Sequence, residues 1–176
     1  MKLLTLKIIL IFTYLISSST SYAIQQPKFK NLIVHKDPLK HREIAFYDLN
    51  NELINLDNYK NSLVIINFWA TWCAPCREEM PHLDKLQSID KLENLKIFPI
   101  NVGKEKIEKV EKFFLELKIK NLNIYFDDTA KLANKFSLRG IPTSVIINKK
   151  GEEFARIDGE VNFLDKKFLK WLSKYD

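Results

Sequence analysis

The sequence is poor in cysteine. Only two cysteines occur among 176 residues, Cys73 and Cys76, and they form one C-x-x-C motif. No cysteine is left for a second disulfide, so the pair is either a redox centre or a small local cross-link. A disulfide that closes so short a loop removes little chain entropy from the unfolded state, which makes a purely structural role the weaker alternative. No cysteine stands directly after the N-terminal apolar segment, which excludes attachment of a lipid there.

Other features that define particular classes of protein are also missing. The chain has no internal repeats, no low-complexity tracts and no patch of interleaved basic and aromatic residues. The formal net charge is +6, and removing the two lysines of the first 23 residues lowers it to +4. The remaining lysines are scattered among acids on predicted helices, which is typical of a solvated surface. Nucleic-acid binding is therefore not expected.

The first 23 residues have the pattern of a secretory signal. Lys2 and Lys7 supply positive charge, and small residues, Ser21 and Ala23, stand where a signal peptidase requires them. The apolar run 3–16 is shorter than the ~20 residues that cross a bilayer. Cleavage after Ala23 is predicted, with an uncleaved anchor as the alternative. Export places thiols in an oxidising compartment, and the periplasm is the predicted location.

The length predicts one globular domain. We divide the chain into the signal peptide or anchor 1–23, an extended arm 24–37 and a domain 38–176. His35 and His41, in and beside the polar arm, have no partner pattern and are expected to be solvated.

Hydrophobic periodicity predicts alternating strands and helices in the domain, and so an α/β fold. Two alternating segments flank Asn50 and Asn51, which tolerate the positive φ of a hairpin turn. Strands are predicted over 44–49, 52–56, 63–66, 95–102, 123–127, 144–148 and 153–157, and helices after Cys73 and over 105–117, 128–136 and 162–174.

The cysteines lie where the apolar strand 63–66 gives way to a helix. The first N–H groups of a helix lack internal partners and carry partial positive charge, so they stabilise a thiolate at Cys73 and lower its pKa. Cys76 follows one turn later on the same face, as suits a resolving thiol. Pro75 fits the first helical turn, where no N–H donor is needed.

Two segments carry a resemblance to a known family. Residues 68–81 read FWATWCAPCREEMP, and residues 140–143 read GIPT. Over roughly 38–172 the sequence resembles the thioredoxin superfamily, and within it the TlpA-like and ResA-like extracytoplasmic thiol–disulfide oxidoreductases. The resemblance implies a thioredoxin fold with an N-terminal β-hairpin extension and a helix–strand insert over 105–127. Such inserts shape the choice of partner.

The resemblance also implies roles for individual residues. Cys73 is the nucleophile of a redox-active disulfide, and Cys76 resolves the mixed disulfide. Pro142 matches the cis-proline loop that faces the cysteines, and the main chain of Ile141 is placed to pair with an extended partner strand. Trp72 forms an apolar wall beside the reactive sulfur, with simple packing as the alternative.

One position departs from thioredoxin. The buried acid that thioredoxin carries six residues before the first cysteine is Asn67 here, which cannot accept a proton from Cys76. ResA-like proteins have a glutamate three residues after the second cysteine, and Glu79 stands at that position. A carboxylate with a raised pKa there is an acid–base partner for Cys76. The alternative for Glu79 is a solvated helix acid, as expected for Glu78.

The predicted function is reduction of disulfides in exported client proteins. Strong oxidants of the superfamily place a histidine between the cysteines, whereas Ala74 and Pro75 resemble the reductant branch. The resemblance implies apocytochrome c or a copper-site protein of respiratory oxidase as client, and a membrane thiol reductase of the DsbD or CcdA type as electron donor. Thr143 stands where the cytochrome-specific branch usually has an acid, which favours the broader TlpA-like class. No cofactor beyond the disulfide is expected.

Two other functions stay open at this stage. A periplasmic copper metallochaperone would bind the metal with Cys73, Cys76 and His82, although copper-delivering relatives use a wider C-x-x-x-C. A non-catalytic thioredoxin-like binding domain would keep the motif without the chemistry. A peroxidase is disfavoured, since the Thr or Ser three residues before a peroxidatic cysteine, with its matching Pro, is missing.

Overall fold

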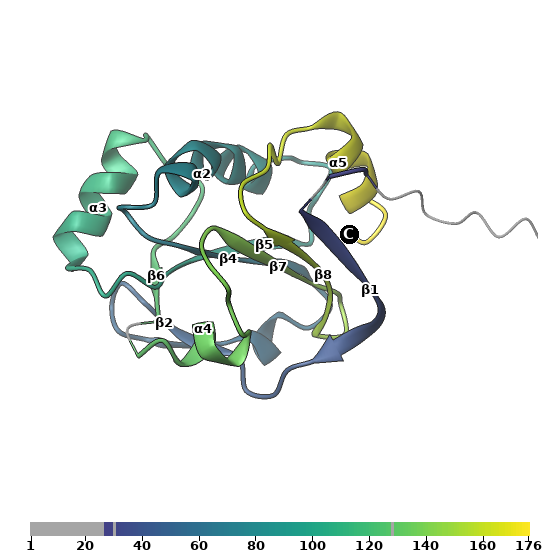
Figure 1. Cartoon of the computed structure of the whole chain (residues 1–176), viewed down its shortest axis with the longest axis horizontal. Coiled ribbons are helices and arrows are strands. Elements are labelled where there is room, and N and C mark those ends of the chain that lie inside the picture. Colours follow the sequence, from purple (N-terminus) through teal and green to yellow (C-terminus); the bar gives the residue numbers. More distant parts are fainter. Residues whose placement is uncertain (1–26, 30, 128) are drawn as a thin grey trace, which may run out of the picture.

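A mixed sheet forms the centre of the computed structural model, which describes residues 27–29, 31–127 and 129–176. Its eight strands in these ranges follow the order β1-β8-β7-β4-β5-β6-β2-β3 (Figure 1). β4 and β5 are parallel and central, and β7 pairs with β4 in the antiparallel sense. The predicted signal segment 1–23 lies outside the described residues. Within those residues, no helix combines the length and the apolar character that crossing a bilayer requires.

The strands and helices have the following bounds. The strands are β1 (Leu32–Lys40), β2 (Ala45–Asp48), β3 (Leu53–Asn55), β4 (Leu63–Trp69), β5 (Leu95–Asn101), β6 (Tyr125–Phe126), β7 (Thr143–Ile147) and β8 (Glu152–Asp158). The helices are the 3-10 turn η1 (Leu56–Tyr59), α2 (Ala74–Gln87), α3 (Ile107–Glu116), α4 (Lys131–Lys135) and α5 (Lys166–Leu172).

The fully buried strand β4 separates two apolar clusters because its side chains alternate between the two faces of the sheet. Leu63, Ile65 and Trp69 pack with α2, α3 and α5. The residues between them, including Val64 and Ile66, pack with the β2–β3 hairpin, η1 and α4. In Figure 1, α2, α3 and α5 accordingly lie above the sheet and α4 below it.

The central strands bring the two signature segments together. β4 leads directly into the C-x-x-C helix α2, and the antiparallel register places Phe68 opposite Thr143 and Asn67 opposite Ser144. The loop 140–142, which leads into β7, therefore lies at the C-terminal end of β4, where the chain continues towards the cysteines. This juxtaposition follows from strand pairing and is the one expected of a thioredoxin fold.

Most predicted elements are confirmed. The segments 44–49 and 52–56 form the β2–β3 hairpin, and the predicted insert contains α3 and the short strand β6. The closing helix α5 is shorter than the predicted 162–174, because Asp165 caps its start by accepting hydrogen bonds from Lys167 N and Phe168 N. The predicted helix 128–136 is likewise reduced to α4.

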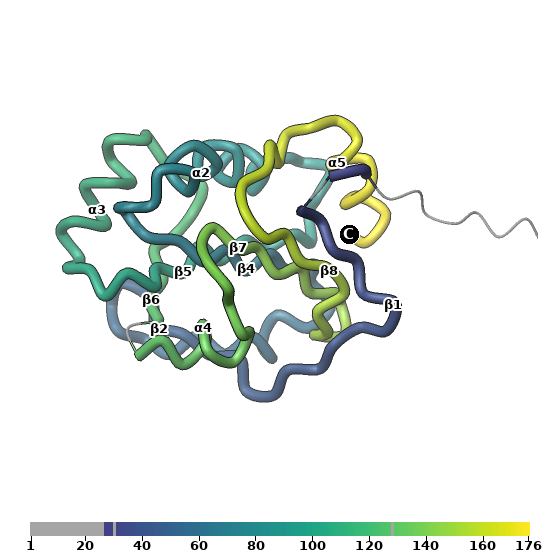
Figure 2. The backbone as a smooth tube through the Cα atoms, in the orientation of Figure 1, coloured from purple at the N-terminus to yellow at the C-terminus, as the bar shows by residue number. Residues whose placement is uncertain are grey.

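The predicted boundary at residue 38 falls inside β1. Residues 32–40 form an edge strand that pairs with β8, with Leu32 opposite Ile157, and Figure 2 shows the two segments running side by side. The sheet therefore begins at Leu32, and the second half of the segment described as an arm belongs to it.

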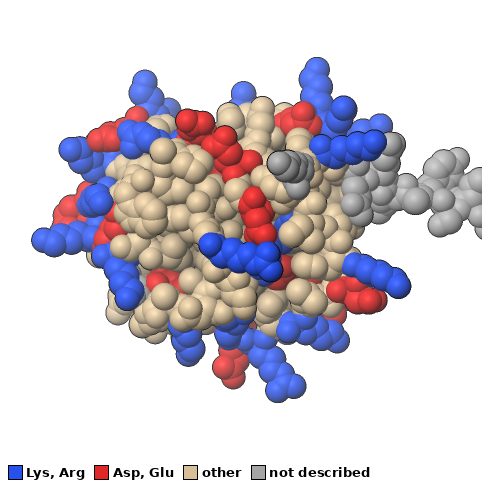
Figure 3. Space-filling model, in the orientation of Figure 1, with Lys and Arg blue, Asp and Glu red and all other residues tan. Residues whose placement is uncertain are grey.

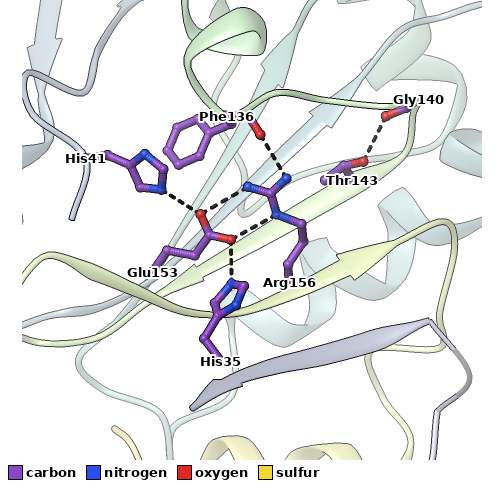
Figure 4. A network of polar contacts seen from close by, with 7 residues as sticks. All are labelled: His35, His41, Phe136, Gly140, Thr143, Glu153 and Arg156. Atoms are coloured by element: carbon purple, nitrogen blue, oxygen red, sulfur yellow. Dashed lines mark hydrogen bonds and ion pairs between the residues drawn. The ribbon is translucent and has the colours of Figure 1, made fainter. Parts of the chain in front are cut away.

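The expectation that His35 and His41 are solvated is wrong. Their side chains are 19% and 15% exposed, and their Nε2 atoms lie 2.9 and 2.7 Å from the two carboxylate oxygens of the fully buried Glu153. Arg156 contacts the same carboxylate and donates a hydrogen bond to the carbonyl of Phe136 (Figure 4). The pairing of β1 with β8 creates this cluster, and no local pattern in the arm indicates it.

Charges of both signs cover the surface. On the face drawn in Figure 3, lysine and arginine side chains project around the outline, and acidic side chains lie between them. This mixture agrees with the solvated surface expected from the sequence.

Candidate active site

The two cysteines occupy the first turn of α2. Cys73 is the N-cap residue and Cys76 lies inside the helix, and their sulfurs are joined as a disulfide with a Cα–Cα distance of 5.3 Å. The main-chain N–H of Cys76 points at Cys73 Sγ, with an N–S distance of 3.3 Å. Cys73 is 5% exposed, whereas Cys76 is fully buried. Cys73 is therefore the more accessible sulfur, and the helix N-terminus is placed to stabilise its thiolate.

A short turn delivers Cys73 to this position. The N–H of Cys73 donates to the carbonyl of Ala70 at 3.2 Å, and Trp69 before the turn is fully buried against Phe113. Trp72, the residue before Cys73, is 66% exposed. Trp69 therefore packs in the core, and Trp72 is the exposed apolar side chain next to the reactive sulfur.

The loop before β7 has the predicted cis peptide bond, between Ile141 and Pro142. Its shape is fixed by two hydrogen bonds: Gly159 N donates to the carbonyl of Pro142 at 2.8 Å, and Thr143 Oγ1 donates to the carbonyl of Gly140 at 2.8 Å. A shallow hollow of about 280 Å³ lies over the loop and reaches Asp158. This loop thus offers a preformed concave surface at the start of β7.

Glu79 is buried beneath the cysteines on α2. Its side chain lies on the helical face of Cys76, one turn further on, and the residue is 2% exposed. Asn67 Nδ2 donates to Glu79 Oε1 at 2.7 Å and to Ser144 Oγ at 2.9 Å. Burial outweighs the Asn67 hydrogen bond and raises the pKa of Glu79 to about 8. The solvated alternative for Glu79 is wrong, while Glu78 beside it is exposed.

The Asn67 contact orients the carboxyl group of Glu79. Because Asn67 donates to Oε1, that oxygen acts as an acceptor. Oε2 has no hydrogen-bond partner among the described residues. Asn67 therefore holds one oxygen of Glu79 in place between β4 and α2.

His82 belongs to no metal site formed by the residues that the structure describes. Among residues 27–29, 31–127 and 129–176, no three His, Cys, Asp or Glu side chains are arranged to hold a metal ion. His82 Nδ1 is buried without a hydrogen-bond partner in the same ranges.

Sequence reasoning missed two contacts to the redox segment. Ser144 accepts from Asn67 across 77 residues of sequence, and Glu105 accepts from Thr71 across 34 residues. The strand alternation that puts Asn67 and Ser144 on one face was visible in the sequence. The Glu105 contact had no such signal, because it depends on how the insert folds back.

Comparison with known proteins assigns the chain to a family. The model of the AhpC/TSA family matches residues 36–152. The chain belongs to the AhpC/TSA family. The family match covers the motif, the insert and the cis-proline loop, and it confirms the resemblance to the thioredoxin-like proteins.

The curated relatives of this family member include bacterial ResA proteins. It is 35% identical over 110 residues to the thiol-disulfide oxidoreductase ResA of Geobacillus kaustophilus, over 62% of each chain. It is 30% identical over 112 residues to ResA of Bacillus subtilis, over 64% of this chain and 62% of the relative. The chain thus matches less than two thirds of the length of these relatives.

Solved structures confirm the fold. StoA from Bacillus subtilis has a TM-score of 0.61 and 26% identity, covering 76% of this chain and 98% of StoA. A protein described as a putative thiol:disulfide interchange protein DsbE from Chlorobium tepidum has a TM-score of 0.66 at 23% identity, covering 77% and 96%. The thioredoxin fold of this AhpC/TSA family member is thereby established.

Proposed function

We propose that this chain is an exported thiol–disulfide oxidoreductase that reduces disulfides in client proteins. The observation that carries the proposal is the position of the Cys73–Cys76 disulfide, with the more accessible sulfur at the N-cap of α2 and the buried one a turn below it. The family membership and the ResA relatives, which are named thiol-disulfide oxidoreductases, support the same chemistry.

The reaction proceeds through a mixed disulfide. The Cys73 thiolate attacks one sulfur of the client disulfide, forms a Cys73–client bond and releases the other client sulfur as a thiolate. The Cys76 thiolate then attacks Cys73 Sγ and displaces the first client sulfur. Two electrons pass from the dithiol to the client, which is left with two thiols, and the Cys73–Cys76 disulfide is regenerated.

Glu79 supplies the proton step at Cys76 in this proposal. Cys76 must lose its thiol proton before it attacks, and a carboxylate with a pKa of about 8 matches the basicity of a thiolate. The transfer between the two groups is then nearly balanced in free energy. In the molecules in which Glu79 is ionised, Oε2, which has no hydrogen-bond partner among the described residues, is the atom that takes the proton.

The surface around Cys73 is suited to an extended client segment. Trp72 offers an exposed apolar wall, and the cis-proline loop presents the main chain of Ile141 for β-type pairing. Ala74 and Pro75 between the cysteines favour the reductant direction. Apocytochrome c or a copper-site protein is the proposed client, a DsbD- or CcdA-type membrane reductase the electron donor, and the periplasm the location.

A disulfide-reduction assay tests the proposal. The unmodified protein, recycled by dithiothreitol, should accelerate the reduction of insulin, and Cys73→Ser should abolish the acceleration because the attacking thiolate is gone. Glu79→Gln should slow it at least tenfold, whereas the matched variant Glu78→Gln, which alters an exposed neighbour, should not.

Two results would contradict the proposal. Absence of any acceleration by the unmodified protein, with both thiols free by titration, argues for a non-catalytic binding domain. Retention of copper at sub-micromolar concentration by the reduced protein, without disulfide reduction, argues for the metallochaperone.

A further inference from the structure

A buried carboxylate from the insert holds the turn that leads to Cys73. Glu105 Oε2 accepts a hydrogen bond from the main-chain N–H of Thr71 at 2.7 Å, and Glu105 Oε1 accepts one from the Thr71 hydroxyl. Thr71 lies two residues before Cys73, inside the turn closed by the Cys73 N–H and the Ala70 carbonyl. Both hydrogen-bond donors of Thr71 are therefore engaged by one side chain from a distant part of the chain.

Glu105 is itself firmly held. Asn101 Nδ2 at the end of β5 donates to Oε2 at 3.0 Å, and Lys109 Nζ lies 2.5 Å from Oε1. The Glu105 side chain is 4% exposed. Burial opposes its ionisation, but the hydrogen bonds from Lys109, Thr71 and Asn101 outweigh burial and lower its pKa to about 2. The carboxylate is thus charged at every pH at which the protein would act.

Gly103 makes room for this arrangement. A Cβ at that position would stand 2.7 Å from Glu105 Oε2 and 2.8 Å from Glu105 Cγ. The far end of a free glutamate would move aside, but four hydrogen-bonding contacts hold this one. The N–H of Gly103 also donates to Asn101 Oδ1 at 2.9 Å, so the residues around Glu105 form one connected network.

The insert contacts the redox helix at a second place. Arg77, the residue after Cys76, pairs with Glu116 of α3 at 2.6 Å, and its guanidinium lies over the ring of Phe113 at 5.3 Å. The Arg77–Glu116 pair is exposed and is expected to contribute little. The buried contact at Thr71 is the one that fixes geometry.

We propose that Glu105 is a positioning residue for the redox site, which holds Cys73 Sγ at the start of α2 by fixing Thr71 and the turn 70–73. The inference rests on the proposed function for its biological meaning, but it concerns only how the chain places its own sulfur. If the turn is released, Cys73 Sγ spends less time near the N–H of Cys76, and the thiolate loses part of the stabilisation that the helix N-terminus provides.

The test is the pH dependence of Cys73 alkylation by iodoacetamide in the reduced protein, with Cys76→Ala as the common background. Glu105→Ala removes the anchor, Gly103→Ala displaces it while keeping its charge, and Thr71→Val removes one of its contacts. Glu111→Ala is the matched control, since it removes an exposed acid of α3. Glu79 is present in every variant, so any effect of its ionisation on the alkylation rate of Cys73 is the same in all of them.

Glu105→Ala and Gly103→Ala should each slow alkylation at pH 7 about three- to tenfold, with equal rates at high pH, because the thiolate fraction has fallen. Thr71→Val should show the same effect to a smaller extent, and Glu111→Ala none. The proposal is overturned if the variants only melt at lower temperature and keep the profile of the parent. It is also overturned if Glu105→Ala speeds alkylation at pH 7, since Glu105 would then act through its charge.

These outcomes are independent of the proposed function. The alkylation assay needs no client, whereas failure of the proposed function appears as inactivity of the unmodified protein towards insulin. Thr71→Val keeps the backbone contact to Glu105, so it remains informative if the other variants do not fold.

Discussion

Glu79 and Glu153 are both buried glutamates, yet their surroundings hold them in opposite protonation states. Glu79 is 2% exposed and meets neutral donors, Asn67 and the main chain of Val161, and burial raises its pKa to about 8. Glu153 is fully buried, but hydrogen bonds from Arg156, His35 and His41 outweigh burial and hold its pKa below the ordinary value. Burial alone does not decide the charge of a carboxyl group; the donors that it meets do.

The two carboxyl groups also differ in how many of their oxygens have a hydrogen-bond partner. Both oxygens of Glu153 are occupied, each by one histidine and by Arg156, and the cluster joins β1, β8 and the end of α4 (Figure 4). Glu79 Oε2 has no partner within the described residues. The saturated carboxylate is therefore suited to holding the fold, and the unsaturated one to exchanging a proton.

The largest effect on stability is expected at Glu153. Glu153→Ala leaves the Arg156 guanidinium, 15% exposed, without its carboxylate, and should lower the free energy of unfolding by about 3–5 kcal/mol. Urea denaturation of the oxidised protein measures this loss. Insulin reduction per folded molecule should be unchanged. If insulin reduction per folded molecule also fell in Glu153→Ala, Glu153 would contribute to the reaction as well as to stability, which contradicts the separate roles given to the two glutamates.

Glu79→Gln should have the opposite effect on stability. The native carboxyl group ionises near pH 8 and the unfolded one near 4.5. The native state therefore binds more protons between these values, and its stability falls as pH rises through that window. Removing the group should stabilise the oxidised protein by on the order of 3 kcal/mol at pH 7, and by almost nothing at pH 4. Equal effects at the two pH values would show that Glu79 does not have the raised pKa.

The pH dependence of the free energy of unfolding tests the lowered pKa of Glu153 at acidic pH. A lowered native pKa means that the contribution of Glu153 is complete above its unfolded pKa and is lost as pH falls through the native pKa. Each decade of pH in that window should cost up to about 1.4 kcal/mol in the unmodified protein. Chemical denaturation of Glu153→Gln from pH 6 to 2 should show a flatter acid limb. An unchanged limb would assign acid unfolding to other carboxylates.

The smallest effect is expected at the histidines. His35→Phe removes one of the donors to Glu153 but leaves Arg156 and His41, and should lower the free energy of unfolding by about 1 kcal/mol at pH 7. Thermal denaturation beside Leu39→Ala, a change at an exposed position of the same strand, separates the hydrogen bond from general effects on β1. A loss as large as that of Glu153→Ala would mean that the cluster acts as one unit.

The sequence predicted the parts of the site that depend on local pattern. The C-x-x-C at a strand–helix junction and the hairpin before it are local, and the cis-proline loop was placed by resemblance. The contacts of Glu153 with His35 and His41 join residues 118 and 112 positions apart, and the Glu105–Thr71 contact depends on the fold of the insert. Strand order and loop geometry decide such contacts, and the hydrophobic periodicity of a single segment predicts neither of them.

The central claim is that Cys73 attacks the disulfides of other proteins and Cys76 releases them. Reduced Cys76→Ala mixed with oxidised insulin should accumulate a covalent adduct, and peptide mapping should locate the bond at Cys73, because the resolving thiol is missing. Cys73→Ala, with Cys76 intact, should accumulate none. An adduct that forms equally well through Cys76, or no adduct with either variant, would contradict the account.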